Sequence, residues 1–322
     1  MSYRIEDGEA VHDGLCRCAR EQVDGASRML SEEIERDSFN TVHAARKSLK
    51  KERSLLRLGR STLGTEQRRA ENGVFREVGR RLGGVRDADV VLQALDDLAE
   101  RFAGQVPKST FEALRECLDI QREAARRRLV ESACTNDALD SLKSARLRID
   151  DWQLLNNEWA AVSDGLLRSY RRGHRASKRA RSRPTSENLH EWRKRAKDLW
   201  YHLRLLQRAS PQALRGHAKE AHRLSDLLGD DHDLSVLREA LIGMAREVAV
   251  DVDPVFGLID HRRGQLQASA FFLGDRVYAE SPKAFLRRIH RYWRAWRRET
   301  QAADSRQPAE LANAANPLAS SS

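Results

Sequence analysis

One charged pattern occurs twice in this sequence, and it limits the possible folds more than any other feature. The first copy spans residues 42–50, with the sequence VHAARKSLK, and the second spans residues 189–197, with the sequence LHEWRKRAK. Both copies have the pattern apolar-His-x-x-Arg-Lys-x-x-Lys, where x is any residue. In both copies a further Arg lies fourteen residues after the His. A pattern repeated in this order predicts two equivalent elements within one fold.

A helix separates the charged positions of each copy from the apolar ones. At about 100° per residue, the charged side chains fall within an arc of roughly 100° on one face. They are His43, Arg46, Lys47, Lys50 and Arg57 in the first copy, and His190, Arg193, Lys194, Lys197 and Arg204 in the second. The apolar stripe on another face consists of Val42, Ala45, Leu49 and Leu56, or of Leu189, Trp192, Ala196, Leu199 and Leu203. Each copy is therefore predicted to be a helix that packs one side on a core and presents a positive face.

Like charges one or two turns apart destabilise a helix, so each positive face needs an explanation. A solvated surface would explain one isolated copy. A polyanion that neutralises the face explains why the same residue order, including the histidine, occurs twice. The repetition therefore favours an anionic ligand that both copies contact.

Composition supports a helical, anion-binding protein. The chain has 322 residues and a net charge of +10; 33% of its residues are charged, with only 18 Gly and 7 Pro. This composition is typical of an all-helical protein, and the length suits two domains or one duplicated domain. The excess of positive charge is rich in arginine, which favours phosphate-bearing partners.

The cysteines and the apolar runs indicate in which cellular compartment the protein is expected. The four cysteines have neither zinc-site spacing nor the arrangement of a disulfide framework. The polar N-terminus does not resemble a signal peptide, and no apolar run approaches the roughly 18 residues of a membrane span. We therefore expect a reduced, cytoplasmic protein without a membrane span.

A second pair of matching stretches predicts an internal duplication. Leu82-Gly83 followed by Asp87 matches Leu228-Gly229 followed by Asp233 at an offset of 146 residues, and the two motif histidines are 147 residues apart. Anchors about 40 residues apart thus keep their offset within one residue. We expect an all-α fold of two bundles, with a half-repeat at 3–150 and another at 151–300.

Turn and cap residues predict the helices. In the first half these span residues 9–30, 38–60, 65–82, 86 onward, 107–133 and 134–150, the last being a short helix or a loop. Asp37 or Ser38 is expected to cap the second of these helices, and Gly83-Gly84 interrupts the chain. In the second half they span residues 152–181, 186 onward with Ser186 as the cap, 211–228, 230 onward, 254 onward and 283–298. Residues 301–322 are predicted to be a disordered tail because they are rich in Ala, Ser, Asn and Pro.

The Asp-rich stretches 86–89 and 230–233 have two interpretations. Capping of a helix start is favoured because both stretches follow a glycine, and a metal site is the alternative.

For His43 and His190, cations within one turn disfavour a metal, and no general base accompanies either ring, so contact with phosphate is the preferred role. No nucleotide-binding loop, hydrolase or metalloprotease motif is present, nor the alternating Glu and Lys strand of triphosphate tunnel enzymes. We expect no catalytic residue, metal or cofactor.

Other basic residues extend the positive faces. They are predicted to contribute further ligand contacts and comprise Arg76, Arg80, Lys219, Arg223, Arg126, Arg263, Lys283 and Arg287. The basic run 171–183 shows no apolar spacing, so it is interpreted mainly as a solvated or nonspecific anion surface.

Together these features resemble the CHAD family, whose name stands for conserved histidine α-helical domain. The resemblance covers residues 3–298 as a single CHAD-type domain within 1–300. It is carried by the repeated His-Arg-Lys-Lys helices, by the stretches 86–90 (RDADV) and 228–234 (LGDDHDL), and by the closing stretch 278–285 (YAESPKAF) with Tyr292, Trp293, Trp296 and Arg297. No CYTH triphosphatase domain accompanies it.

The resemblance implies two bundles related by a pseudo-twofold axis, with their basic faces around a central channel or groove. It implies binding of inorganic polyphosphate and an association with polyphosphate granules. The histidine, arginine and two lysines of each motif become the leading ligand contacts, with Arg57 and Arg204 as further contributors. One departure is Lys51 against Asp198, which makes the second face less positive at that corner.

Two functions of other classes remain open. A nucleic-acid binder fits the positive charge, but no recognised motif is present and aromatic residues do not alternate with the basic face. Nucleic acid is therefore expected only as a nonspecific competitor. An enzyme acting on phosphorylated substrates would use His43 or His190, but neither has a metal-binding carboxylate cluster beside it.

Overall fold

The computed structural model describes residues 3–34, 36–131, 134–153, 155–244 and 250–314. Within these residues the chain is almost entirely helical, and the one extended pairing is a bridge between Ala103 and Val106. The predicted all-α class is confirmed. No helix in this part of the chain is long and apolar enough to cross a membrane.

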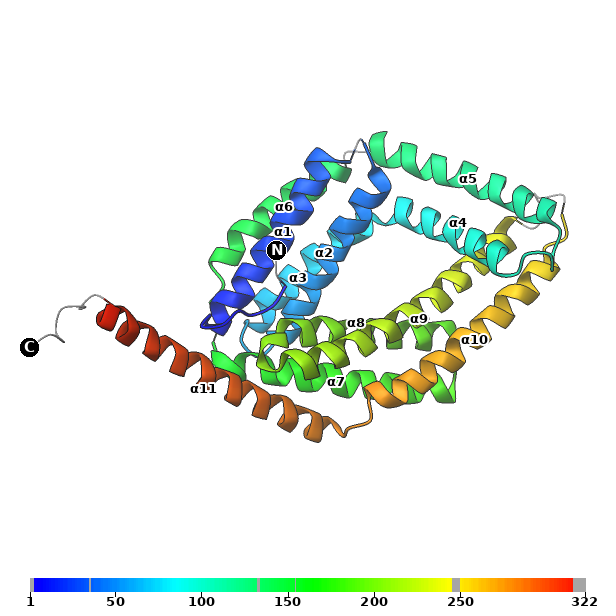
Figure 1. Ribbon diagram of the computed structural model, residues 1–322. Coiled ribbons are helices and arrows are strands. Elements are labelled where there is room, and N and C mark those ends of the chain that lie inside the picture. Colours follow the sequence, from blue (N-terminus) through cyan, green and yellow to red (C-terminus); the bar gives the residue numbers. More distant parts are fainter. Residues whose placement is uncertain (1–2, 35, 132–133, 154, 245–249, 315–322) are drawn as a thin grey trace, which may run out of the picture.

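The helices form two ends joined through a shared middle (Figure 1). One group lies side by side and comprises α1 (Val11–Glu32), α2 (Ser38–Leu58), α3 (Thr65–Arg81) and α6 (Cys134–Asp150). The middle comprises α7 (Glu158–Ser182), α8 (Ser186–Leu205) and the first half of α9 (Pro211–Met244). The opposite end comprises α4 (Gly83–Arg101), α5 (Lys108–Glu131), the second half of α9 and α10 (Asp253–Val277). The short 3-10 helix η1 (Gln207–Ala209) and α11 (Pro282–Ala314) complete the chain and contact each other.

Two hydrophobic cores follow this arrangement rather than the two sequence halves. The larger core joins α1, α2, α3 and α6 to α7, α8, α11 and the adjoining parts of α9 and α10. The smaller core joins α4 and α5 to the second half of α9 and the first half of α10. Each core therefore draws side chains from both halves of the sequence. The duplication itself stays a prediction.

Both motif helices form where the sequence predicts them. The Asp37 carboxylate caps α2 by accepting a hydrogen bond from the Asn40 backbone N–H at 3.0 Å. Thr185, and not the predicted Ser186, caps α8 through the backbone N–H of Asn188 at 3.2 Å. The apolar stripes are fully buried, as predicted, and comprise Val42, Ala45, Leu49, Leu56, Leu189, Trp192, Ala196, Leu199 and Leu203.

Several predicted boundaries are wrong. Helix α9 runs without interruption from Pro211 to Met244, so residues 230–233 lie inside a helix and do not start one. An interior glycine such as Gly229 costs only about 1 kcal/mol, and leucines on both sides of it are buried, so packing outweighs that cost. Helix α4 begins at Gly83 rather than at residue 86, and α7 begins at Glu158 rather than at residue 152. Helix α11 continues to Ala314 through the start of the predicted tail, and residues 315–322 lie outside the described residues.

The basic run 171–183 was interpreted mainly as a solvated surface, but one of its faces is buried. Small residues bury one face of this part of α7 against neighbouring helices, and they are Gly173, Ala176, Ser177 and Ala180. Small side chains give little hydropathy signal but allow close helix packing, which is why the periodicity is easy to miss. Only the remaining face of the run is solvated.

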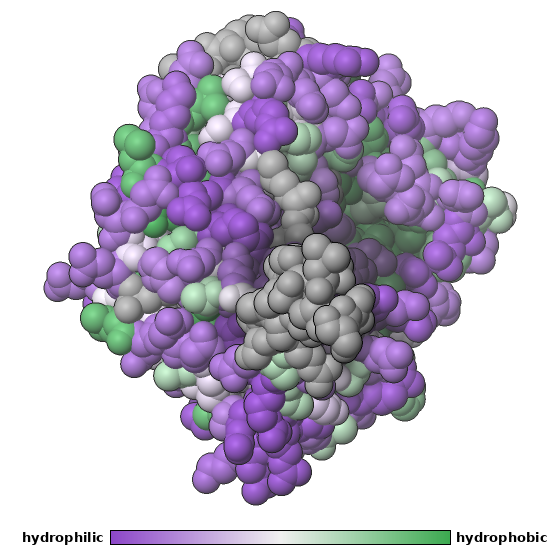
Figure 2. Space-filling model, turned by 60° about the vertical axis from the view of Figure 1, so that its left-hand side comes forward, coloured by the Kyte–Doolittle hydropathy of each residue, from purple (hydrophilic) through white to green (hydrophobic). Residues whose placement is uncertain are grey.

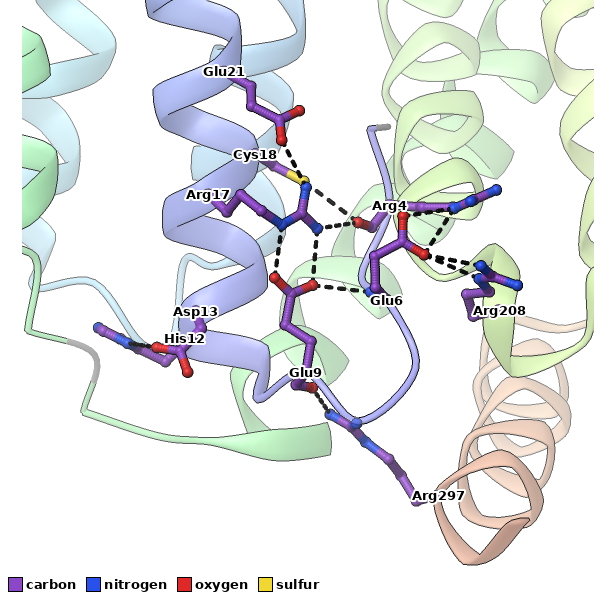
Figure 3. A network of polar contacts seen from close by, with 10 residues as sticks. All are labelled: Arg4, Glu6, Glu9, His12, Asp13, Arg17, Cys18, Glu21, Arg208 and Arg297. Carbon is purple, nitrogen blue, oxygen red and sulfur yellow. Dashed lines mark hydrogen bonds and ion pairs between the residues drawn. The ribbon is translucent and has the colours of Figure 1, made fainter. Parts of the chain in front are cut away.

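The N-terminal segment joins the first helix to the last parts of the chain (Figure 3). The Arg17 guanidinium donates to the Glu9 carboxylate at 2.7 Å, to Glu21 at 3.0 Å and to the Arg4 carbonyl at 2.8 Å. From the other side, Arg297 of α11 donates to the Glu9 carbonyl at 2.8 Å. These bonds hold the segment between α1 and α11, so the closing helix is anchored to the beginning of the chain.

The surface is strongly polar. Figure 2 shows one face that is hydrophilic over most of its area, with apolar residues in small patches and in a hollow on the right of the view. A surface of this kind, with a positive net charge, favours contacts with anions over apolar docking.

Candidate anion-binding site

The two motif helices contact each other and border one cavity of about 460 Å³. From α2 its lining includes Arg46, Lys50, Arg53 and Arg57. From α8 it includes His190, Arg193, Lys194, Lys197, Asp198 and Tyr201. Helices α4 and α9 supply Asp87, Val90, His232, Asp233 and Val236. Seven of the predicted ligand residues therefore meet in one place, although the two motifs lie 147 residues apart in sequence.

The motif arginine of each copy is held in the same way. Arg46 lies 3.7 Å from the Asp87 carboxylate, and Arg193 lies 3.7 Å from the Asp233 carboxylate. Each guanidinium also rests on the glycine four residues before its aspartate. A Cβ at Gly83 would lie 2.9 Å from Arg46 Nη1, and one at Gly229 would lie 3.0 Å from Arg193 Nη2.

These contacts explain the matched Leu-Gly-x-x-x-Asp stretches. The glycine leaves space for the guanidinium, and the aspartate fixes its direction by charge. Neither aspartate caps a helix, because α4 begins four residues before Asp87 and Asp233 is in the interior of α9. The capping interpretation is therefore wrong for both.

Asp198 joins the two motif helices. Its carboxylate is 5% exposed and accepts hydrogen bonds from Arg57 of α2 and Arg195 of α8, each at 3.0 Å. The sequence comparison of Lys51 with Asp198 predicted a less positive second face at this position. The structure shows that Asp198 is a buried, ion-paired group there. Removing one partner of such a group leaves an uncompensated buried charge.

His190 and His232 contact each other at this cavity, and the sequence analysis did not predict this contact. Their ring centroids are 4.2 Å apart, and the Nδ1 atom of His190 is buried without a hydrogen-bond partner. Burial, followed by the charges of His232, Lys194 and Arg193, lowers the pKa of His190 to about 4. The ring is therefore neutral at pH 7 in the unliganded protein.

The remaining motif residues are not among the described lining residues of this cavity. His43 is exposed on α2, with its ring centroid 6.5 Å from that of Phe39. Lys47 is also exposed. The Arg204 guanidinium lies 5.5 Å from the Trp200 ring centroid, a cation–π distance. The two copies therefore place their histidines in different environments.

The eight additional basic residues do not line this cavity. Arg80 pairs with Glu77 at 2.7 Å, and Arg263 pairs with the buried Asp231 at 3.1 Å. Arg126 lines another cavity of about 330 Å³, next to α4 and α5. All of the eight except Arg263 are exposed, and the five not yet described are Arg76, Lys219, Arg223, Lys283 and Arg287. Their contact with a ligand stays a prediction.

Three lining residues were missed by the sequence analysis. Arg53 lies seven residues after Arg46, or about two turns along the same side of α2, so helical spacing could have found it. Tyr201 lies four residues after Lys197, or about one turn along the same side of α8, so helical spacing could have found it too. His232 carried no such signal, because only the packing of α9 against α8 brings it to the cavity.

Positive charge is in excess in the lining of this cavity. Its lining contains seven Lys and Arg side chains but only three carboxylates, those of Asp87, Asp198 and Asp233. In the described part of the chain, no three His, Cys, Asp or Glu residues converge as metal ligands. Excess cations on low-dielectric walls concentrate anions, and guanidinium groups can form paired hydrogen bonds to phosphate oxygens.

Comparison with known proteins identifies related sequences and folds. The family model of the CHAD domain matches residues 18–242. Two uncharacterised proteins of Mycobacterium tuberculosis, MT2285 and Rv2226, are each 29% identical over 268 residues, which is 76% of this chain and 50% of theirs. The chain thus spans about half the length of these curated relatives.

Solved structures show the same fold at low sequence identity. PptA from Streptomyces chartreusis aligns with a TM-score of 0.56 at 16% identity, covering 84% of this chain and 100% of that one. The CHAD domain from the plant Ricinus communis aligns with a TM-score of 0.50 at 18% identity, covering 90% of this chain and 96% of that one.

Proposed function

Because the chain belongs to the CHAD domain family, we propose that it binds inorganic polyphosphate in the cavity between α2 and α8. The single observation that carries this proposal is the convergence of cations from both motif copies on one cavity. Four of them come from α2 and three from α8, with three carboxylates among them. The resemblance of these motifs links such a site to polyphosphate rather than to another anion.

The ligand's chemistry matches the lining. Polyphosphate is a thin, flexible, unbranched chain with about one negative charge per phosphate and no bases, so charge and forked donors suffice to bind it. Binding neutralises like charges that repel each other in the empty cavity and releases counterions. Affinity should therefore fall steeply as salt increases, as it does for nucleic acids.

The protein binds its ligand without cleaving it under this proposal. His190 is surrounded by cations and by His232, and burial keeps it neutral. A general base that activates water needs an orienting partner, and the buried Nδ1 atom of His190 has none. The histidine therefore acts as a contact that can gain a proton when phosphate approaches.

Charge reversal at two sites provides the test. Lys50→Glu with Lys197→Glu changes the cavity, whereas Lys178→Glu with Arg179→Glu makes the same change in net charge on the exposed face of α7. Titration with labelled long-chain polyphosphate at fixed salt should show at least a tenfold loss of affinity for the first pair and a much smaller loss for the control. Thermal melts followed by circular dichroism would confirm that both variants fold.

Competition distinguishes the ligand classes. Polyphosphates of increasing length should displace the label better until the cavity is filled, whereas orthophosphate and diphosphate should compete poorly. Single-stranded DNA, duplex DNA and RNA are compared at equal phosphate concentration. A nucleic acid that competes as well as polyphosphate would favour a general nucleic-acid surface. Orthophosphate release with Mg²⁺ or Mn²⁺ that disappears in His190→Ala would favour an enzyme.

A further inference from the structure

A second cavity, of about 200 Å³, lies beside the first and is lined mainly by arginine. Its arginines come from α2, the turn that follows α2, α3, α7 and α8, and they are Arg57, Arg60, Arg68, Arg168, Arg172 and Arg195. Arg57 borders both cavities, Asp198 borders only the first and Arg195 only the second. The ion-paired group Arg57–Asp198–Arg195 therefore forms the wall between them.

A close helix crossing builds this cavity. Helix α7 meets the end of α2 at Gly165, where a Cβ would overlap the Leu58 carbonyl oxygen and lie 2.6 Å from that of Arg57. Only glycine allows the two backbones to approach this closely. Arg168 and Arg172 follow Gly165 by three and seven residues, so they lie on the same face of α7 and are directed along the end of α2.

The positive charge of the cavity is incompletely neutralised. No carboxylate is among its described lining residues. Three nearby carboxylates pair with lining arginines: Asp198 with Arg57 and Arg195, Asp164 with Arg60 at 3.5 Å, and Glu191 with Arg172 at 3.2 Å. Six arginines and three carboxylates leave a formal excess of three positive charges.

Two arginines account for two of these charges, and the third remains because Arg57 and Arg195 share Asp198. Neither Arg68 nor Arg168 has an ion-pair partner among the described residues, and the Nε atom of Arg68 is buried without a hydrogen bond. Burial, followed by the charges of Arg60, Arg69 and Arg168, lowers the pKa of Arg68. Buried donors without partners and clustered like charges both destabilise the empty state. An anion would remove both costs.

We propose that this cavity is a second anion site, which binds a compact diphosphate group. A phosphoryl group carries about −1.5 to −2 near neutral pH, so a diphosphate group brings about three negative charges to match the excess. The volume of about 200 Å³ suits a small anion with a few waters, since one water occupies about 30 Å³ of liquid. Guanidinium groups on several sides suit its tetrahedral oxygens. This proposal does not rest on polyphosphate binding between α2 and α8, although Arg57 borders both cavities.

Calorimetric titration with inorganic diphosphate tests the proposal. Wild-type protein should show one saturable site, and Arg68→Gln with Arg168→Gln should weaken it at least tenfold. The matched control, Lys178→Gln with Arg179→Gln, removes the same charge from exposed positions on α7 and should retain the affinity. Titration with ADP in parallel shows whether free diphosphate or the diphosphate of a nucleotide is preferred.

Stability gives a second readout that does not depend on the polyphosphate site. Without ligand, the Arg68 and Arg168 variant should melt at or above the wild-type temperature because repulsion is relieved. With saturating diphosphate, only proteins with the intact site should gain stability. Equal diphosphate affinity in wild type and this variant, or no saturable binding by wild type, overturns the proposal.

The Lys50 and Lys197 positions separate the two sites. Lys50→Gln with Lys197→Gln should lose polyphosphate affinity and keep diphosphate affinity. If this variant loses diphosphate as well, the ligand belongs to the first cavity and the second-site proposal fails, while the polyphosphate proposal stands. A different outcome is that wild type does not bind polyphosphate but binds diphosphate with an affinity that depends on Arg68 and Arg168. In that case the polyphosphate proposal fails and the second-site proposal stands.

Discussion

At the scale of single residues, the motif cations divide into those the fold pairs and those it leaves for a ligand. Arg46, Arg193 and Arg57 each face a carboxylate, and Lys194 lies 3.1 Å from Glu191. Lys197 is half-buried and has no ion pair within the described chain, and burial followed by Arg193 lowers its pKa. A charge held in this state gains most when an anion arrives.

His190 provides the prediction at this scale. Its pKa is about 4 in the free protein, and a bound polyanion should raise it. The resulting gain in affinity is complete below the free pKa and is lost as pH rises through the pKa of the complex. The gain should therefore appear on acidification from about pH 6 toward 4, below the range around 6.5 of an ordinary imidazole.

The measurement compares wild type, His190→Gln and His174→Gln over this pH range by polyphosphate titration. His174 is a control because it lies on α7 outside the cavity and burial also lowers its pKa. Each unit by which the ligand raises the His190 pKa corresponds to about a tenfold gain in affinity. An unchanged pH profile in His190→Gln would show that this ring does not contact the ligand.

At the scale of helices, close crossings position both cavities. The contact between α2 and α7 depends on Gly165, so Gly165→Ala should separate the helices and destabilise the fold by about 1–3 kcal/mol. Gly216 is also helical, in α9, but a Cβ there would meet nothing within 4 Å. Gly216→Ala should therefore stabilise by about 0.5–1 kcal/mol.

Urea unfolding of the two variants measures these opposite effects. Both substitutions add one methyl group in a helix, so a difference in sign can come only from the surroundings. If Gly165→Ala is as stable as wild type, α7 does not hold the end of α2 as described. The arginine cavity would then also lack its geometric basis.

At the scale of the whole molecule, the two sequence halves depend on each other. The smaller core packs α4 and α5 against α9 and α10, and the first cavity takes its cations from α2 and α8. Fragments 1–150 and 151–322 should therefore expose apolar surface and bind a hydrophobic dye. Each fragment should have at least tenfold weaker affinity for polyphosphate than the full chain.

Mixing the fragments provides the control, because association should restore both cores and the binding site. Circular dichroism follows the recovered helix, and titration follows the recovered affinity. A single fragment that folds cooperatively and binds like the full chain would contradict the composite site. It would also favour two independent bundles.

Local patterns in the sequence determined the motif helices. The buried stripes from Val42 to Leu56 and from Leu189 to Leu203, the Asp37 cap and the all-α class follow from spacing within a few turns. Such features depend on neighbours along the chain, so one sequence suffices to predict them. The convergence of both positive faces required the family resemblance as well.

Tertiary packing decided the rest. Helix α9 continues through Gly229 because its leucines are buried on both sides, a gain that no local propensity contains. Asp87 and Asp233 orient arginines instead of capping helices. Asp198 accepts a hydrogen bond from Arg57, which lies 141 positions earlier in the sequence. The arginine cavity arises beside the crossing of α2 and α7 at Gly165, where α3 and α8 also contribute lining residues. These outcomes depend on which distant side chains share a space, and that is set by the packed fold rather than by the spacing of residues along the chain.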